Sequence, residues 1–335
     1  MRAAVLPGSG EPLQIREVPD PQAGKGQLVL RVQSAGICGT DLHMAPILPA
    51  GTVMGHEFSG EVVEVGSGAG DFRLGDRVCA LPTLGCGHCA ACRAGEPGQC
   101  ADMKATGLGG SPGAFAEYLV VGASESLRLP EAVSSRRGAL VEPLAVGLHA
   151  VDRAAIPLGA RVLVVGAGPV GLAVSLWARF FGARSIVVSE RAPGRRERSA
   201  AFGATDAIDP DAEEVGPAFA RLTGGPPDVV FECVGVKGLI QDCIGLAAPR
   251  SKVVVVGMCM EPDVIVPGIA VVKELDLTFA IAYRKRDFDL TIAMLAQDRI
   301  ASEEMVTDVV DLEGLCEAFE ALKRPTTQCK VMLEF

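Results

Sequence analysis

A chain of 335 residues is longer than one hydrophobic core usually supports, so two domains are expected. Its formal net charge of −10 argues against a nucleic-acid-binding surface, which needs clustered Lys and Arg. No stretch reaches the ~18 uninterrupted apolar residues of a membrane-spanning helix, and the first residues lack the apolar run of a signal peptide. Eleven cysteines are too few at this length for a disulfide-dense secreted module, so we expect a cytoplasmic protein with reduced or metal-bound thiols.

Short apolar runs separated by turn residues dominate the first part of the chain. Five of them read as strands: residues 2–6, 27–32, 58–66, 75–80 and 114–121. Strands at this spacing, with glycines at the bends, favour a small antiparallel barrel over βαβ units.

A glycine-flanked turn at residues 36–43 carries Cys38, Thr40 and His43, and His56 and Glu57 follow. A thiolate, an imidazole and a carboxylate can all bind zinc, and a catalytic zinc keeps one position open for water or substrate. The mixed donor set beside a hydroxyl predicts such an open site. The alternative is that Cys38 is a buried packing residue.

Residues 86–100 interrupt the strand pattern with the spacing Cys86-x2-Cys89-x2-Cys92-x7-Cys100. The intervening residues are Gly, Ala, Pro and polar, so the loop has no core of its own. Four thiolates can surround one zinc at about 2.3 Å per bond, which would supply the missing stability. Two disulfides or an iron–sulfur cluster are the alternatives, and we favour structural zinc.

An apolar helix is predicted at residues 138–150, and it carries Glu142 directly before a proline. Burying a carboxylate is costly unless it is paired or coordinates a metal, which makes Glu142 a further candidate ligand. The alternative is a helix N-terminal charge favoured by the macrodipole.

A second domain opens with the apolar run 161–165, typical of a parallel strand that is buried on both faces. Gly166, Gly168, Pro169, Val170 and Gly171 follow directly, before a helix predicted at 172–181. Between a strand and a helix this GxGxxG pattern indicates a dinucleotide site, because its glycines allow close approach of the pyrophosphate to backbone N–H groups.

The next strand, 185–189, ends at Glu190, nineteen residues after Gly171. A carboxylate there accepts hydrogen bonds from the adenosine ribose and repels a 2′-phosphate, which favours NAD over NADP. Neighbouring Arg191, Arg195 and Arg196 keep NADP open. Later strands end near Val234 and Gly257, where they would face the dinucleotide. The last fifty residues lack strands that end in glycine, and we expect them to return to the first domain.

These segments together resemble the zinc-dependent medium-chain dehydrogenase/reductase family, and within it the sorbitol, threonine and butanediol dehydrogenase branch. The resemblance implies a GroES-like β-barrel catalytic domain at 1–147 and a Rossmann doubly wound parallel-sheet domain at 148–285. It also implies that residues 286–335 return to the catalytic domain. By the same resemblance, Cys38, His56, Glu57 and Glu142 form the catalytic zinc site, with one or both glutamates bound directly. The four cysteines hold a second zinc.

The resemblance also implies roles for residues beside the metal. Thr40 would contact the substrate oxygen and His43 would relay a proton, while NAD would lie against the glycine loop, Glu190, Arg195, Val234 and Gly257. Family members are commonly homodimers or homotetramers that act on small-molecule alcohols or ketones.

The predicted reaction is the reversible, NAD-dependent oxidation of a secondary alcohol or vicinal diol to a ketone. A sugar, polyol or cyclitol dehydrogenase is the alternative within the family, and a non-catalytic nucleotide-binding redox sensor is the alternative outside it. Only eleven residues, Met44 to Met54, separate His43 from Gly55, fewer than in relatives, and most are apolar. This segment argues mildly against polyols, and it prevents a substrate from being copied from any one relative.

Overall fold

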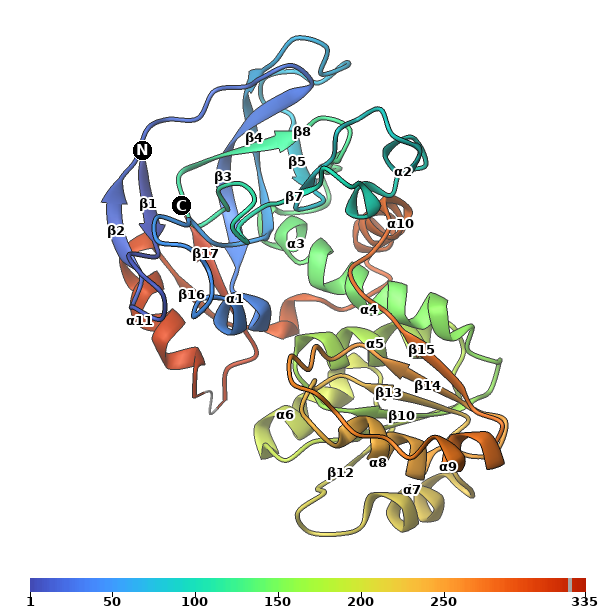
Figure 1. Ribbon diagram of the computed structural model, residues 1–335. Helices are drawn as coiled ribbons and strands as arrows, with labels where there is room; N and C mark the ends of the chain where they lie inside the picture. Colours follow the sequence, from blue (N-terminus) through green and yellow to red (C-terminus); the bar gives the residue numbers. More distant parts are fainter. Residues whose placement is uncertain (325–326) are drawn as a thin grey trace. The chain divides into compact units, whose positions relative to one another are not determined.

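The computed structural model describes residues 1–324 and 327–335, and these form two compact units. The first unit contains Met1–Glu142 and Arg284–Phe335, and the second contains Pro143–Tyr283 (Figure 1). The boundary predicted after residue 147 falls inside helix α4 (Val141–Ala154). The observed boundary, between Glu142 and Pro143, lies in the first turn of the same helix, so no separate linker marks it. The boundary predicted after residue 285 falls in the first turn of α10 (Lys285–Ala296).

The first unit is built on a seven-stranded sheet whose central strand is β3 (Gln27–Gly36). Along one side β3 pairs with β4 (Glu57–Val65) over its whole length, and along the other it pairs first with β8 (Tyr118–Gly122) and then with β17 (Lys330–Glu334). The remaining strands extend the sheet at its two ends: β5 (Arg77–Ala80) and β9 (Ser126–Arg128) beyond β4, and β16 (Val306–Val310) beyond β17. All pairs are antiparallel except β16 with β17.

Short elements cover and connect this sheet. They are α1 (Gly39–Met44), β6 (Thr83–Leu84), α2 (Ala90–Arg93), η1 (Pro97–Gln99), β7 (Lys104–Ala105), α3 (Ser135–Ala139), η3 (Glu303–Met305) and α11 (Leu312–Leu322). The helix predicted at 138–150 is therefore two helices, α3 and α4, with Leu140 between them. The strand predicted at 114–121 begins only at Tyr118, because Ala116 makes an isolated bridge to Ala3 instead of joining the ladder.

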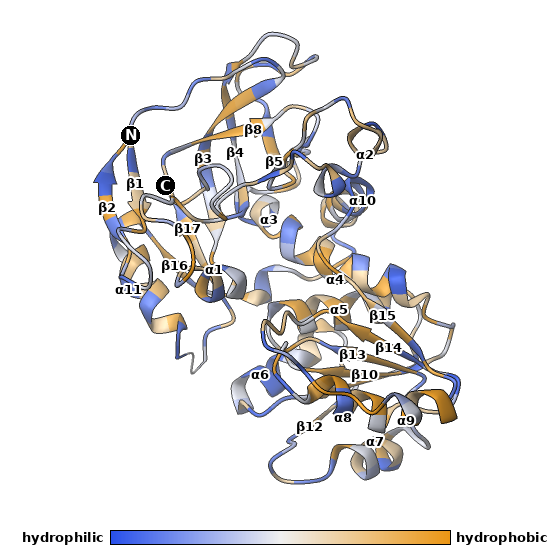
Figure 2. Ribbon diagram, viewed as in Figure 1, coloured by the Kyte–Doolittle hydropathy of each residue, from blue (hydrophilic) through white to orange (hydrophobic). Residues whose placement is uncertain are grey.

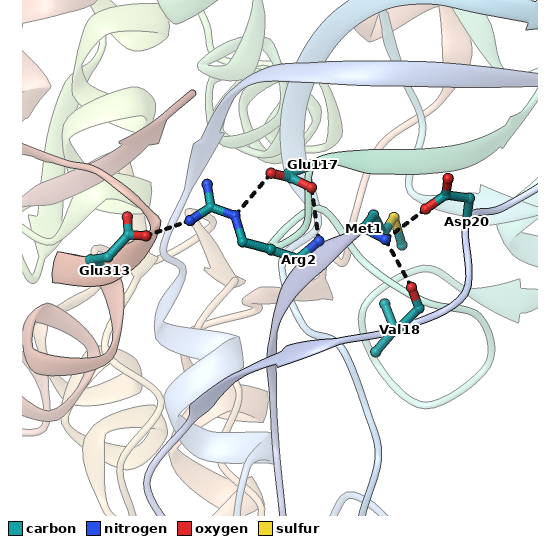
Figure 3. Close-up of polar contacts among 6 residues, drawn as sticks. All are labelled: Met1, Arg2, Val18, Asp20, Glu117 and Glu313. Carbon is teal, nitrogen blue, oxygen red and sulfur yellow. Dashed lines mark hydrogen bonds and ion pairs between the residues drawn. The ribbon is translucent and has the colours of Figure 1, made fainter.

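The N-terminal hairpin pairs β1 (Arg2–Val5) with β2 (Gln14–Glu17), a strand that the sequence did not predict. Arg2 binds Glu117 and also Glu313 of α11, while the Met1 amino group binds Asp20 and the Val18 carbonyl (Figure 3). These exposed ion pairs are each worth little. The apolar residues of β1 and α11 belong to one buried core, which joins the C-terminal segment to the first unit.

The second unit is a six-stranded parallel sheet with the strand order β12-β11-β10-β13-β14-β15. Its strands are β10 (Arg161–Val165), β11 (Ser185–Ser189), β12 (Asp206–Ile208), β13 (Val229–Glu232), β14 (Lys252–Val255) and β15 (Asp276–Phe279). Figure 2 shows the middle of this sheet as strongly hydrophobic, as expected where both faces are buried. The order reverses between β10 and β13, which is where a doubly wound sheet binds dinucleotides.

Helices connect the strands of this sheet. They are α5 (Pro169–Phe180), α6 (Pro193–Arg198), η2 (Ser199–Phe202), α7 (Val215–Thr223), α8 (Leu239–Leu246) and α9 (Pro267–Val272). Helix α5 begins three residues before the predicted start, because Pro169 has the fixed φ that suits a first helical position. Within residues 1–324 and 327–335, no helix has both the length and the apolar character needed to cross a bilayer.

Candidate active site

Cys38 lies where the chain leaves β3 and enters α1. It is the N-cap of that helix, with its Sγ accepting a hydrogen bond from the Thr40 N–H at 3.4 Å. The Asp41 carboxylate accepts the Cys38 N–H at 2.9 Å, which completes a reciprocal cap. The backbone thus fixes the thiol at the end of the sheet's central strand.

His56 and Glu57 are brought to Cys38 by the pairing of β3 with β4. Gly36 is opposite Glu57 in this ladder, and a Cβ at position 36 would lie 2.1 Å from a Glu57 carboxylate oxygen, so only glycine leaves room for that side chain. One ligand atom each of Cys38, His56 and Glu57 lies within 4.8 Å of the others. Three donors from two separate segments of the chain therefore converge, and two of them, His56 and Glu57, are buried.

Asp41 orients His56. The Nδ1 of His56 lies 3.1 Å from Oδ1 of Asp41, which leaves Nε2 as the imidazole donor for a metal. Burial lowers the pKa of His56, but the charges of Asp41 and Cys38 raise this pKa well above its usual value. Negative charge therefore dominates the surroundings of His56, which suits the binding of a cation.

Lys330 is a residue of this site that the sequence did not reveal. Its ammonium donates to both oxygens of Glu57 at 2.6 Å and to the Ile37 carbonyl at 3.0 Å, and both side chains of the pair are 1% exposed. Burial lowers the pKa of Lys330, whereas the charges of Glu57, Cys38 and Glu142 raise it above its usual value. Asp41 was missed as well, although an acidic residue three positions after an N-cap is a recognisable helix-capping signal.

The other predicted residues of the site are spread around this cluster. Glu142 is buried in the first turn of α4, near enough to act on Lys330, but it is not in the group whose ligand atoms lie within 4.8 Å. Thr40 and His43 are both in α1, three residues apart and thus on one face; Thr40 is half-buried and His43 is exposed.

The four loop cysteines also converge. Ligand atoms of Cys86, Cys89, Cys92 and Cys100 lie within 4.8 Å of one another. Cys89 is the N-cap of α2, and its Sγ accepts the Cys92 N–H at 3.5 Å. Backbone N–H groups of His88 and Cys89 lower the pKa of Cys86 to about 6, which favours the thiolate. His88 is exposed, and its Nδ1 lies 2.9 Å from the Cys86 carbonyl.

Both clusters fit zinc by donor chemistry. The loop offers four sulfur atoms, which suits a closed structural site, while the Cys38 cluster offers a mixed donor set among negatively charged side chains. No third group of this kind occurs among the residues that the structure describes.

The predicted dinucleotide loop lies at the point where the strand order of the second unit reverses. Gly166 has φ +96°, and a Cβ at Gly171 would lie 1.9 Å from the Gly166 carbonyl oxygen, so the turn requires both glycines. Pro169, Val170 and Gly171 form the first turn of α5. The first N–H groups of a helix have no partner within it, so those of Val170 and Gly171 could donate to a pyrophosphate, whereas Pro169 has none.

Glu190 is fixed beside this loop. One carboxylate oxygen accepts the Ala167 N–H and the other accepts the Ala192 N–H, both at 2.9 Å. Arg195 lies on the following helix, α6.

Glu232 is a second carboxylate beside the loop, and the sequence did not single it out. It is buried at the end of β13 and accepts the N–H groups of Val234 and Gly235 at 2.7 and 2.8 Å. The side chain of Val234 reaches Gly166, and the Gly257 N–H donates to the Glu232 carbonyl. Glu232 thus organises the backbone on which two of the predicted cofactor residues lie.

Comparison with known proteins agrees with this geometry. Residues 24–131 match the alcohol dehydrogenase GroES-like domain, and residues 169–297 match the zinc-binding dehydrogenase domain. The chain is 33% identical to (R,R)-butanediol dehydrogenase of Bacillus subtilis, over 96% of each chain, and 33% identical to sorbitol dehydrogenase of Gallus gallus, over 96% of this chain and 93% of that one.

Solved structures give the same result. The crystal structure of the Bacillus subtilis butanediol dehydrogenase superposes with a TM-score of 0.90 at 32% identity, covering 100% of this chain and 99% of the other. A protein from Sinorhizobium meliloti 1021, described as a zinc-binding dehydrogenase and bound to NADP, gives a TM-score of 0.91 at 31% identity with the same coverage. The predicted fold class, a GroES-like domain plus a Rossmann domain, is confirmed.

Proposed function

Because the chain belongs to the zinc-dependent medium-chain dehydrogenase/reductase family, we propose that it oxidises a secondary alcohol or vicinal diol to a ketone with NAD, reversibly. Family membership makes it a zinc- and NAD(P)-dependent alcohol or polyol dehydrogenase. The observation that carries the finer proposal is the convergence of Cys38, His56 and Glu57, in a chain that also has a glycine loop at a topological switch point.

Cys38 and His56 would hold the catalytic zinc, and Glu57 and Glu142 would complete the site, one or both directly. When bound, zinc supplies Lewis acidity that lowers the pKa of the substrate hydroxyl. The Asp41 carboxylate would hold the proton of His56 on Nδ1 and leave Nε2 for the metal, and Lys330 balances the charge of Glu57. Cys86, Cys89, Cys92 and Cys100 would hold the structural zinc.

Thr40 and His43 would move the proton that the substrate hydroxyl loses. The Thr40 hydroxyl lies two residues from Cys38 and would accept this proton, and His43 would pass it to solvent. The exposure of His43 and its place one turn along the same helix face support this role.

The second unit would hold the dinucleotide against Gly166, Gly168, Pro169, Val170 and Gly171. NAD held there would supply the hydride acceptor. Glu190, fixed by two backbone N–H groups, would accept hydrogen bonds from the adenosine ribose and repel a 2′-phosphate. Arg195, Val234 and Gly257 would line the same site.

The substrate class is proposed from the segment that begins at the last residue of α1. Met44 to Met54 is mostly apolar, and Ile47 in it is exposed, which favours an apolar secondary alcohol or a small diol. A polyol is the second candidate, since one relative is named a sorbitol dehydrogenase. A non-catalytic redox sensor is disfavoured because the donor residues of both metal clusters are present.

A substrate panel tests this proposal. Zinc-loaded protein is mixed with secondary alcohols, diols and polyols, each with NAD and with NADP, and absorbance at 340 nm is followed. We expect reduction of NAD by one secondary alcohol or diol. If polyols react far faster than apolar alcohols, the substrate assignment is reversed. If no compound gives a change in absorbance although elemental analysis finds both zinc ions, the proposed substrate class is rejected.

We also propose a cytoplasmic homodimer or homotetramer. A cytoplasmic setting suits thiols that must stay reduced to bind zinc. Strand β15 is at the edge of the sheet in the second unit, and exposed apolar side chains lie near it in the chain: Val264, Val266, Val271, Val272, Phe279 and Ile281. Such a surface is typical of an interface between subunits. Light scattering during size-exclusion chromatography would give the subunit number, and a monomer at micromolar concentration would contradict the proposal.

A further inference from the structure

The second unit has a network of arginines and aspartates beside Glu190. Four arginines lie close together in the chain at positions 191, 195, 196 and 198, directly after the carboxylate proposed to face the adenosine ribose. From sequence alone this run leaves NADP open, because an arginine after such a strand is the usual partner of a 2′-phosphate. The contacts of these arginines therefore bear on cofactor choice.

Arg196 is held on three sides. One guanidinium nitrogen donates to the main-chain carbonyls of Glu190, at 2.7 Å, and Arg191, while another donates to Oδ2 of Asp209 at 2.9 Å. The side chain of Arg196 is 19% exposed and that of Asp209 is 31% exposed. The guanidinium therefore lies next to the residue that would meet the ribose, and both of its terminal nitrogens contact protein acceptors.

Asp209 is itself well fixed. It follows β12, the neighbour of β11 in the sheet, and its other carboxylate oxygen accepts the Asp211 N–H at 3.0 Å. Arg191 forms a similar pair with Asp211 at 3.1 Å, but both of those side chains are exposed, so solvent weakens that pair. Of these two pairs, Arg196 with Asp209 is the better shielded.

We propose that Asp209 is a positioning residue for cofactor specificity: by holding Arg196 against the Glu190 carbonyl, it withholds this guanidinium from a 2′-phosphate and so maintains the preference for NAD. The inference rests on the proposed use of NAD. Glu190 repels the phosphate directly, while Asp209 removes the arginine that could otherwise compensate by a charge-assisted contact. Two groups then discriminate between the cofactors: Glu190, which attracts NAD, and Arg196, which would favour NADP if Asp209 did not restrain it.

The test is a change of charge that keeps the turn. Asp209→Asn retains an oxygen for the Asp211 N–H but loses the ionic hold on Arg196. We expect it to tighten NADPH binding by about tenfold and to leave NADH binding within about twofold, measured as Kd by calorimetry. The gain in NADPH affinity should shrink as salt is raised, because it arises from a charge contact at the protein surface.

Two further variants isolate the mechanism. Asp206→Asn removes the same charge from an exposed position on β12 and should change neither Kd. Arg196→Gln in the Asp209→Asn background should abolish the gain, and in the wild-type background it should leave NADPH binding unchanged. Each variant is first checked by its apo melting temperature.

The outcomes separate this inference from the proposed function. A wild type that binds NADPH more tightly than NADH contradicts the NAD assignment itself. If the wild type prefers NADH, the role of Asp209 is overturned by any of three results: unchanged NADPH binding in Asp209→Asn, an equal gain in Asp206→Asn, or a gain that persists without Arg196. If Asp209→Asn does not fold, weaker NADPH binding in Arg196→Gln alone overturns the inference and unchanged binding supports it.

Discussion

The two cysteine-containing clusters of the first unit are held in opposite ways. Cys38, His56 and Glu57 come from the end of one strand and the start of its neighbour, and His56 and Glu57 are buried and held by Asp41 and Lys330. The four loop cysteines come from one stretch of fifteen residues in which only two residues, Pro97 and Cys100, are buried. In the first cluster the sheet positions the donors. In the second, local backbone hydrogen bonds shape the loop, but almost no buried side chains support it.

This difference indicates whether the fold stabilises the metal site or the metal stabilises the fold. Where a fold places the ligands in advance, losing the metal removes chemistry but leaves the structure. Where the ligands lie on a segment without a core, metal binding supplies folding free energy. The following variants test this contrast, from the largest expected effect to the smallest.

Cys38→Ser should abolish catalysis and leave the fold intact. Loss of the thiolate removes one catalytic ligand, and we expect turnover to fall by at least about a thousandfold, with one zinc equivalent lost. The melting temperature should change little. Turnover at 340 nm, elemental zinc and thermal unfolding measure the three effects, and Cys316→Ser in α11, outside both clusters, is the control. If the Cys38→Ser variant kept full turnover after its metal had been stripped, zinc-dependent catalysis at this cluster would be ruled out.

Cys92→Ser should do the reverse. With three thiolates left, the loop loses its zinc, and we expect the free energy of unfolding to fall by on the order of 3 kcal/mol, while molecules that remain folded keep most of their turnover. Limited proteolysis with mass analysis should find new cleavage between residues 86 and 100, and Cys38→Ser serves as the matched control. A variant that loses zinc but resists cleavage in the loop would show that the loop holds itself together.

Lys330→Met tests how far the fold of the catalytic cluster depends on its own ion pair. Removing the ammonium leaves the Glu57 carboxylate buried without its partner, which should cost about 3 kcal/mol of unfolding free energy. Denaturant unfolding measures this loss, and Lys330→Arg, which keeps the charge, should recover part of it. Equal stability of the methionine variant would mean that Glu57 finds another cation or turns to solvent.

The sequence predicted both clusters because cysteine and histidine are scarce, chemically specific and locally spaced. It could not predict Lys330, which is 273 residues from Glu57 in the chain. In β17 a lysine among apolar residues indicates only that a charge is somewhere in a strand, and its partner depends on how β17 pairs with β3.

Secondary structure shows the same limit. Strand β2 was missed because all four of its residues are exposed, so no alternation of apolar and polar residues marks it. The residues of α3 and α4 read as one helix because the run 138–150 is mostly apolar. The signal of the break between them is Pro143, which has no N–H to donate to the carbonyl of Ala139 and therefore suits the first turn of a new helix. The sequence left the choice between NAD, favoured by Glu190, and NADP, favoured by the nearby arginines, open. The contact of Arg196 with Asp209 depends on the pairing of β11 with β12, which the sequence does not show.

Asp41→Asn makes the smallest change to the catalytic cluster. Asparagine can still accept the Cys38 N–H, but a neutral amide holds the His56 imidazole less firmly and adds no negative charge to the pocket. We expect zinc affinity to fall by about 10- to 100-fold, with thermal stability of the zinc-loaded protein nearly unchanged. Competition with a chromophoric chelator measures the affinity of the catalytic site, with the loop zinc as the internal reference. Equal loss of zinc from both sites would mean that Asp41 supports the fold of the whole first unit. That result would contradict the contrast between a catalytic site that the sheet positions and a loop that its metal stabilises.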